Sequence, residues 1–167
     1  VRLSDKAMAI TPSGIPYPDL REDMIALVDL ETGEWSGPLK PSGERELHRR
    51  IYLARPKAGA IVHTHQNAAS ACAASRVAVP SPRGPIPCAP YALPGTSKLA
   101  EATTAALGDG RAVLLANHGA LAVAATMSEA FDVALELESD AADFLMRKAG
   151  GKLPARPDSA WDPSALS

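Results

Sequence analysis

Two short apolar runs in this chain each end in a histidine motif, and this pattern constrains the fold more than any other feature. Residues 58–62 lead into His-Thr-His at 63–65, and residues 112–116 lead into Asn-His-Gly at 117–119. Short runs rich in Ala, Val, Ile and Leu are typical of strands with both faces buried. The sequence therefore predicts a sheet inside the protein, with histidines at the ends of two of its strands.

Three of the four histidines are candidates for a metal site. Side chains two positions apart in a strand point to the same face, so His63 and His65 are expected side by side. His118 follows the second strand, and Gly119 permits a tight turn beside it. Catalytic zinc sites typically have three protein ligands and one open position. A surface pair and a hydrogen-bonded turn histidine are the ordinary alternatives, but the three together favour a divalent metal.

The composition fits one domain and excludes several classes of partner. The 167 residues are 46% hydrophobic, which is enough for a substantial core. A net charge of −2 indicates neither a nucleic-acid surface nor a basic membrane patch. Cys72 and Cys88 are too few for a disulfide framework, and no apolar run has membrane-spanning length. We therefore expect a cytoplasmic protein with reduced thiols that binds neither nucleic acid nor membrane.

Hairpins and alternating strands and helices indicate an α/β domain with a mixed sheet. A capping box at Thr126 and Glu129 opens the longest helix, whereas the proline-rich residues 76–97 predict an irregular segment. The predicted domain covers residues 1–150, with a further segment expected before it, and residues 151–167 are expected to form a loose tail. Strands are expected at 7–11, 24–30, 34–36, 58–65, 111–116 and 120–124, and helices at 44–54, 66–74, 98–107 and 126–148.

Two glycine-bearing turns are candidates for binding an anion. Ser13-Gly14 ends the first strand, and Ser42-Gly43 immediately precedes a helix, whose N-terminus favours negative charge. Each turn offers backbone N–H groups and a hydroxyl. In the ordinary alternative, Ser42 is simply the helix N-cap and Ser13 an unremarkable turn residue. Neither turn matches a P-loop, so the residues alone leave both interpretations open.

Glu44 lies in the first turn of the same helix, where a carboxylate complements the helix dipole. Most residues in such positions do nothing more. Beside a metal and an anion site, however, Glu44 would be suited to act as a general acid or base. His48 lies one helical turn further on, and we interpret it as a packing or supporting histidine rather than a fourth ligand.

Five motifs carry a resemblance to a known family. They are Ile-Thr-Pro-Ser-Gly-Ile-Pro-Tyr at 10–17, Lys-Pro-Ser-Gly-Glu at 40–44, His-Thr-His at 63–65, Ile-Pro-Cys-Ala-Pro-Tyr at 86–91 with Gly-Thr at 95–96, and Leu-Leu-Ala-Asn-His-Gly at 114–119. In this order they resemble the class II aldolase/adducin family, in particular its L-fuculose-phosphate aldolase branch. The resemblance covers about residues 1–148. It implies a three-layer α/β/α fold with a central mixed, largely antiparallel sheet.

The resemblance also implies a role for each candidate residue. Glu44 would be the catalytic acid/base. The metal would be Zn²⁺, with Mn²⁺ or another divalent ion as the alternative, and its ligands would be His63, His65 and His118. The substrate phosphate would be held by Ser13, Gly14, Ser42 and Gly43. The protein would be a homotetramer with its active site near a subunit interface.

The activity implied by the resemblance is that of a zinc-dependent aldolase, a carbon–carbon lyase. Such an enzyme cleaves a short ketose phosphate to dihydroxyacetone phosphate and an aldehyde through a metal-stabilised enediolate. The alternatives within the family are an epimerase, decarboxylase or dehydratase that acts on a sugar or sugar-acid phosphate. A non-enzymatic adducin-like interaction domain is a further alternative, against which the three intact histidines argue.

The chain departs from the family pattern at three places. Gly43 stands where the family usually has a second serine. Residues 81–85 lack the tyrosine-bearing segment that family members usually carry there, and no tyrosine follows Tyr91. Because the missing tyrosine is a proton donor in the aldolase branch, this departure keeps the epimerase, decarboxylase and dehydratase alternatives open.

Overall fold

The computed structural model describes residues 1–150. The tail predicted over residues 151–167 lies outside this part of the chain. Within residues 1–150, no helix is both long enough and apolar enough to cross a membrane.

The first three strands form a small antiparallel sheet of their own. They are β1 (Ala7–Ile10), β2 (Ala26–Asp29) and β3 (Trp35–Ser36), in the order β1-β2-β3. The short 3₁₀ helices η1 (Tyr17–Asp19) and η2 (Glu22–Met24) join β1 to β2, so the strand predicted to begin at residue 24 begins only at Ala26. The sequence patterns predicted one mixed sheet and did not show that these three strands form a second one.

The main sheet has four strands in the order β4-β7-β6-β5. These are β4 (Ala60–Thr64), β7 (Gly119–Ala124), β6 (Ala112–Leu115) and β5 (Cys88–Ala89). The pairs β4–β7 and β7–β6 are antiparallel, whereas β6–β5 is parallel. This arrangement is the mixed, largely antiparallel sheet that the sequence predicted.

Strand β5 corrects the prediction that all of residues 76–97 are irregular. Its two residues extend the edge of β6, where Leu114 N–H donates to Pro87 O at 2.8 Å and Ala116 N–H donates to Ala89 O at 3.2 Å. A strand of two residues between prolines is too short to show hydrophobic periodicity, so its sequence gave no signal.

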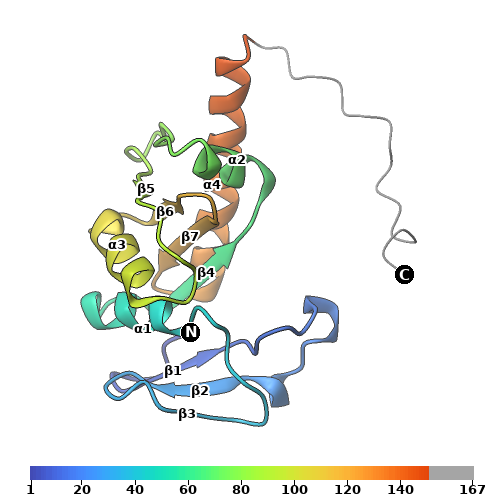
Figure 1. Ribbon diagram of the computed structural model, residues 1–167, viewed down its shortest axis with the longest axis vertical. Coiled ribbons are helices and arrows are strands. Elements are labelled where there is room, and N and C mark those ends of the chain that lie inside the picture. The colour runs from blue at the N-terminus through green and yellow to red at the C-terminus, as the bar shows by residue number, and fades with distance from the viewer. Residues whose placement is uncertain (151–167) are drawn as a thin grey trace.

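Helices cover both faces of the main sheet (Figure 1). Helices α1 (Arg45–Ala54) and α3 (Ser97–Leu107) lie on one face, and α2 (Asn67–Ala74) and α4 (Met127–Lys148) lie on the other. Successive residues of β6 and β7 point to opposite faces of the sheet, so they pack into two different hydrophobic cores. Val113, Leu115, Leu121 and Val123 pack toward α1 and α3, whereas Ala112, Leu114, Ala120 and Ala122 pack toward α2 and α4.

The small sheet extends the first of these cores. Met8 and Val28 belong to the same buried cluster as Ile51 and Tyr52 of α1. Figure 1 shows this sheet at the lower end of the molecule, next to α1. Its other face is partly open, since Leu27 and Trp35 are exposed. The small sheet thus packs on α1, and the segment that follows β1 lines the same cavity as His63 and His65.

The long helix α4 starts as predicted. Thr126 Oγ1 accepts from Glu129 N–H at 3.2 Å, and Glu129 Oε2 accepts from Thr126 N–H at 3.1 Å. The heptad-like spacing of apolar residues predicts a buried stripe of Ala130, Val133, Leu137, Ala141 and Phe144; the first four are buried, whereas Phe144 is only partly buried. Helix α4 is therefore anchored at its N-terminus and along its length against the sheet.

Gly59 should be irreplaceable for stability, because a Cβ at this position would lie 1.9 Å from Ala125 O. We expect Gly59→Ala to lower the free energy of unfolding by about 2–4 kcal/mol, since the backbone of β4 or β7 must shift. Urea unfolding monitored by circular dichroism measures this. Gly43→Ala is the matched control, because a Cβ there meets nothing within 4 Å. An equal loss in both variants would contradict this interpretation.

Candidate metal centre

His63 is held in one orientation by the sheet. It lies two residues after Ile61 on β4, and on the same face. Its Nδ1 lies 2.9 Å from Ala120 O on the adjacent strand β7. A carbonyl only accepts, so Nδ1 carries the proton and Nε2 keeps a free lone pair. Nε2 is buried and has no hydrogen-bond partner, which leaves it available as a ligand atom.

The other two histidines converge on the same point. His65 follows the end of β4, and His118 lies in the turn between β6 and β7. The ring centroids are 4.9 Å apart for both His63–His65 and His63–His118, and 5.2 Å apart for His65–His118. One ligand nitrogen from each ring lies within 4.8 Å of the others. Such a set of nitrogens can surround one divalent cation.

The turn that carries His118 differs from the expected one. The residue with positive φ is Asn117, at 56°, and not Gly119. Gly119 is required for a different reason, because a Cβ there would lie 2.4 Å from His65 Cδ2 and 2.5 Å from Thr64 O. The missing side chain therefore allows the two histidine-bearing segments to approach each other.

Glu44 reaches the histidines from the end of α1. It occupies the N-cap position rather than the first turn that was predicted, because the helix begins at Arg45. Its Oε1 accepts from Gly95 N–H at 3.0 Å. Its Oε2 is buried without a partner. One carboxylate oxygen is thus held by the Pro94-Gly95 turn, and the other is free toward the site.

Burial keeps His63 and His118 in the neutral form that binds metals. Burial, with smaller contributions from the nearby His118 and His65, lowers the pKa of His63 to about 4, against the hydrogen bond with Ala120. Burial also lowers the pKa of His118, which the Glu44 carboxylate opposes. His48 lies behind the site on α1, and burial lowers its pKa to about 3. His48 is absent from the cluster of possible ligands, as expected.

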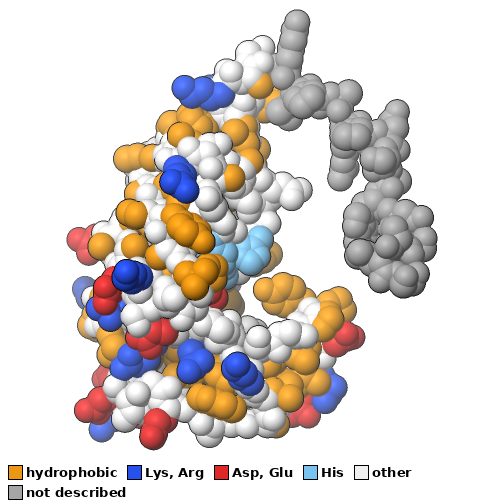
Figure 2. Space-filling model, in the orientation of Figure 1, with side chains coloured by type: hydrophobic (Ala, Val, Ile, Leu, Met, Phe, Trp, Pro, Cys, Tyr) orange, Lys and Arg blue, Asp and Glu red, His pale blue; other side chains and the backbone are white. Residues whose placement is uncertain are grey.

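The cluster opens into a cavity of about 310 Å³. Figure 2 shows the histidines in a hollow between the helical part of the molecule and the small sheet. Of the predicted site residues, Gly43 alone is not part of the cavity wall. The wall includes Ser13, Gly14, Ser42, Glu44 and the three histidines.

The two glycine-bearing turns are brought together by an antiparallel bridge between Pro12 and Pro41. Ser13 N–H donates to Lys40 O, and Ser42 N–H donates to Thr11 O, both at 2.9 Å. These two amides are therefore occupied, which corrects the expectation that they face an anion. Ser42 is not the helix N-cap either, because its Oγ accepts from Glu44 N–H at 3.2 Å in the turn before the helix.

Two groups at this site had no role predicted from the sequence. Tyr17 in η1 lines the cavity together with the metal cluster, although its side chain is largely exposed. The Gly95 amide holds Glu44. Both lie inside motifs that carried the family resemblance, at 10–17 and 95–96, and their presence there was the available signal.

Comparison with known proteins identifies the family. Residues 1–144 match the class II aldolase and adducin N-terminal domain. The chain belongs to this family. The predicted family is confirmed, and a superposition on a solved L-fuculose 1-phosphate aldolase confirms the predicted fold. That superposition has a TM-score of 0.83 at 34% identity and covers 92% of this chain and 76% of the other.

Curated members of the class II aldolase family align over most of this chain. A 5-methylthioribulose-1-phosphate/5-deoxyribulose-1-phosphate aldolase from Rhodospirillum rubrum is 37% identical over 152 residues, which are 86% of this chain and 68% of that protein. An L-fuculose phosphate aldolase from Escherichia coli (strain K12) is 37% identical over 146 residues, which are 83% of this chain and 67% of that protein. The predicted enzyme class, an aldolase of the class II family, is thus confirmed.

Metal-free protein should lose stability as the pH falls from about 6.5 to about 4. The pKa of His63 is about 4 in the folded protein against 6.5 for an ordinary histidine. In that window the unfolded chain binds a proton that folded His63 does not, so acid favours unfolding. Above and below this window His63 does not change how stability depends on pH, and the stability lost across the window is not regained below it.

The measurement is urea unfolding of chelator-treated protein at several pH values, for wild type and for His63→Gln. The slope of unfolding free energy against pH between 4 and 6.5 should be smaller in the variant, because carboxylate contributions common to both cancel in the comparison. Identical slopes would show that His63 is not held neutral by burial.

Proposed function

We propose that this protein is a zinc-dependent aldolase that cleaves a short ketose phosphate to dihydroxyacetone phosphate and an aldehyde. One observation supports this most directly. Two buried imidazole nitrogens and one buried carboxylate oxygen without partners line the same cavity as the exposed His65. Unpartnered buried polar atoms are rare and costly, so their convergence points to a bound cation and a reacting group.

The residues present suit a divalent metal. His63 Nε2 is presented by the bond from Nδ1 to Ala120, as a metal-binding histidine normally is. His63, His65 and His118 would hold the ion, and neutral imidazoles favour zinc. A bound divalent ion supplies Lewis-acid stabilisation of the negative charge that develops on the substrate oxygens.

Glu44 is proposed to move the proton at the reacting carbon. In the cleavage, the C3–C4 bond breaks, its electron pair stays with C3, and the C4 hydroxyl passes its proton to solvent water as the aldehyde forms. C3 then gains a proton, and Glu44 Oε2 is the buried oxygen that faces this region. Because Gly95 N–H holds Oε1, the carboxylate keeps one oxygen directed at the substrate.

The phosphate would lie at the other side of the same cavity. Ser13 and Gly14 line it, and the N-terminus of α1 is adjacent through Ser42 and Glu44. Since the amides of Ser13 and Ser42 already donate to carbonyls, we assign the phosphate contacts to the Ser13 hydroxyl and the Gly14 amide. Of the four residues predicted to hold the phosphate, Gly43 alone is exposed outside the cavity wall, so we assign it no direct contact.

The alternative reactions in this family share the metal and the proton transfer. A solved relative at 31% identity and TM-score 0.74, YgbL from Klebsiella pneumoniae, is described with aldolase, epimerase and decarboxylase left open. The lack of the tyrosine-bearing segment keeps these alternatives open, whereas Tyr17 supplies one phenol at the cavity. Metal-loaded, full-length protein assayed on a panel of ketose and aldonate phosphates distinguishes them, because only an aldolase releases dihydroxyacetone phosphate.

Zinc-loaded wild-type protein should contain about one metal ion per chain. His63→Ala should lose most of it, because one of three ligands is removed. His48→Gln should keep it, because His48 lies outside the ligand cluster. Elemental analysis after gel filtration makes the measurement. Equal metal in wild type and His63→Ala, or none in wild type after zinc loading, would refute the assignment.

Glu44→Gln should lower kcat by about 10²–10⁴-fold, the usual contribution of a general base, with metal content and fold retained. Glu46→Gln is the matched control, because Glu46 is on the same helix but pairs with Arg49 at 3.1 Å. It should keep nearly all activity. Steady-state kinetics on the best substrate of the panel provide the test, and near-normal turnover of Glu44→Gln would remove this carboxylate from the mechanism.

We also propose a homotetramer with active sites near subunit interfaces, a proposal supported by the family resemblance. Light scattering on the full-length protein at micromolar concentration should give a mass of about four chains. A monomer under these conditions would contradict it.

A further inference from the structure

A second and larger cavity lies at the opposite end of the main sheet from the histidines. It measures about 610 Å³, a size typical of sites for small organic ligands. Arg111 lines it just before β6 begins, whereas His118 follows the end of that strand. The length of β6 thus separates this cavity from the metal centre. The metal chemistry proposed above makes no use of it.

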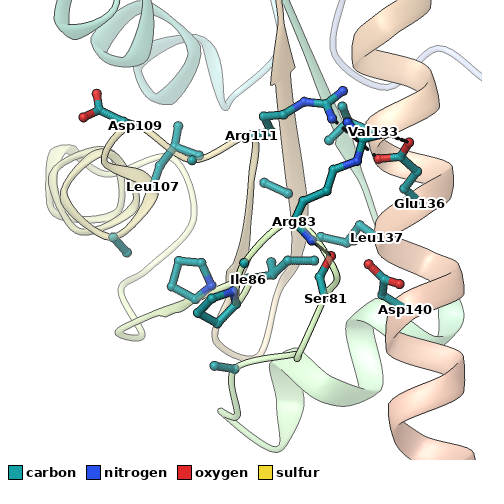
Figure 3. A pocket seen from close by; sticks show the side chains of 17 residues that line it. Ser81, Arg83, Ile86, Leu107, Asp109, Arg111, Val133, Glu136, Leu137 and Asp140 are labelled. Atoms are coloured by element: carbon teal, nitrogen blue, oxygen red, sulfur yellow. Dashed lines mark hydrogen bonds and ion pairs between the residues drawn. The ribbon is translucent and has the colours of Figure 1, made fainter.

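The walls of this cavity are apolar and well packed. They come from the proline-rich residues 81–87, the end of α3 and the middle of α4 (Figure 3). Ile86, Leu107, Val133 and Leu137 are all at least 92% buried. These walls can accept the apolar part of a ligand without rearrangement of the core.

Two arginines from distant parts of the chain meet at one side of the cavity. Arg83 Nη2 lies 3.2 Å from Glu136 Oε1, and Arg111 Nη1 lies 3.6 Å from Glu136 Oε2. Figure 3 shows both guanidinium groups beside Glu136. One carboxylate therefore serves two cations, and the Arg111 contact is too long for a hydrogen bond. Both arginines keep donors free for a second anion.

Two further cations lie close to these two arginines. A neighbouring hollow of about 410 Å³ shares Arg83 and Arg111 and adds Arg55 and Lys57. Arg55 donates to the uncharged carbonyls of Gly110 and Asp109. The acidic residue of this hollow, Glu129, gives one oxygen to the α4 capping box. The two hollows together have four cationic and four acidic side chains in their walls. Arg83 and Arg111 are the two cations that they share, and Glu136 is the one carboxylate that pairs with both.

The remaining acidic residues restrict where an anion can bind. Figure 3 shows Asp109 pointing away from the cavity. Asp140 lies one helical turn beyond Glu136 on α4, on the same face, and also lines the cavity. A second negative group on the ligand would meet Asp140. The cavity therefore favours a molecule with one anionic end, oriented toward the arginines.

We propose that this cavity binds a small organic anion, an apolar body with a single carboxylate, phosphate or sulfonate group. The anionic group accepts from the donors of Arg83 and Arg111 that Glu136 leaves free, and the apolar body packs on Ile86, Leu107 and Leu137. Two features support this ligand class. The apolar wall suits the apolar body, and two arginines that share a single carboxylate suit the anionic group.

Isothermal titration of zinc-loaded, full-length protein with 1-naphthalenesulfonate tests the proposal. Two probes separate the halves of the ligand: 1-naphthalenemethanol has the apolar body without the charge, and inorganic sulfate has the charge without the body. We expect the sulfonate to bind at least about tenfold more tightly than either, which corresponds to about 1.4 kcal/mol. Equal binding of the alcohol or of sulfate overturns the proposal.

Variants then locate the bound probe. The double variant Arg83→Gln/Arg111→Gln and the cavity-filling Ala78→Trp should each weaken sulfonate binding by about tenfold or more. Ala78 is exposed and lines the cavity, so its replacement leaves the buried core intact. If the double variant fails to fold, each single arginine variant and Ala78→Trp carry the test.

Two variants away from the cavity serve as matched controls. Arg50→Gln removes an arginine that pairs with Glu101 at 3.1 Å away from this cavity, and Ala71→Trp adds the same ring to an exposed position of α2. Both should bind the probe as wild type does. Equal losses in the controls, or binding that His63→Ala abolishes, would place the probe elsewhere and overturn the proposal.

Discussion

The antiparallel pairing of β4 with β7 is the interaction on which the rest of the arrangement depends. Its register sets Thr64 opposite Ala120, so the chain leaves β4 beside Gly119. The two segments approach so closely there that a Cβ on Gly119 would lie 2.5 Å from Thr64 O. Because β6 pairs with the other edge of β7, the turn that carries His118 closes over the same point. Backbone pairing thus fixes where the three rings meet.

The site that results is locally unfavourable, and the two cores must compensate for it. His63 Nε2, His118 Nδ1 and Glu44 Oε2 are buried without partners, at a cost of about 1–3 kcal/mol for each such group. A cation and a substrate would relieve this cost, which links ligand binding to stability. The apolar layers on both faces of β6 and β7 provide the opposing stabilisation.

The parts of this architecture that the sequence predicted are those set by local patterns. Apolar runs ending in histidine predicted β4 and β6, and the capping box predicted the start of α4, because each signal lies within a few residues. The separate small sheet, strand β5 and the Pro12–Pro41 bridge depend on pairing between distant segments. No local period encodes such pairing. For the same reason, the occupied amides of Ser13 and Ser42 and the Gly95 bond to Glu44 required the structure.

The positions of the two proposed sites follow from one property of the main sheet. Every residue of β6 is buried, so polar groups can occur only where the strand begins or ends. One end carries His118, which burial keeps neutral and free to bind a cation. The other carries Arg111, which joins other cations around an apolar cavity. A sheet enclosed on both faces thus concentrates its polar side chains at two ends, and the different side chains at those ends suit the two different ligands proposed for them.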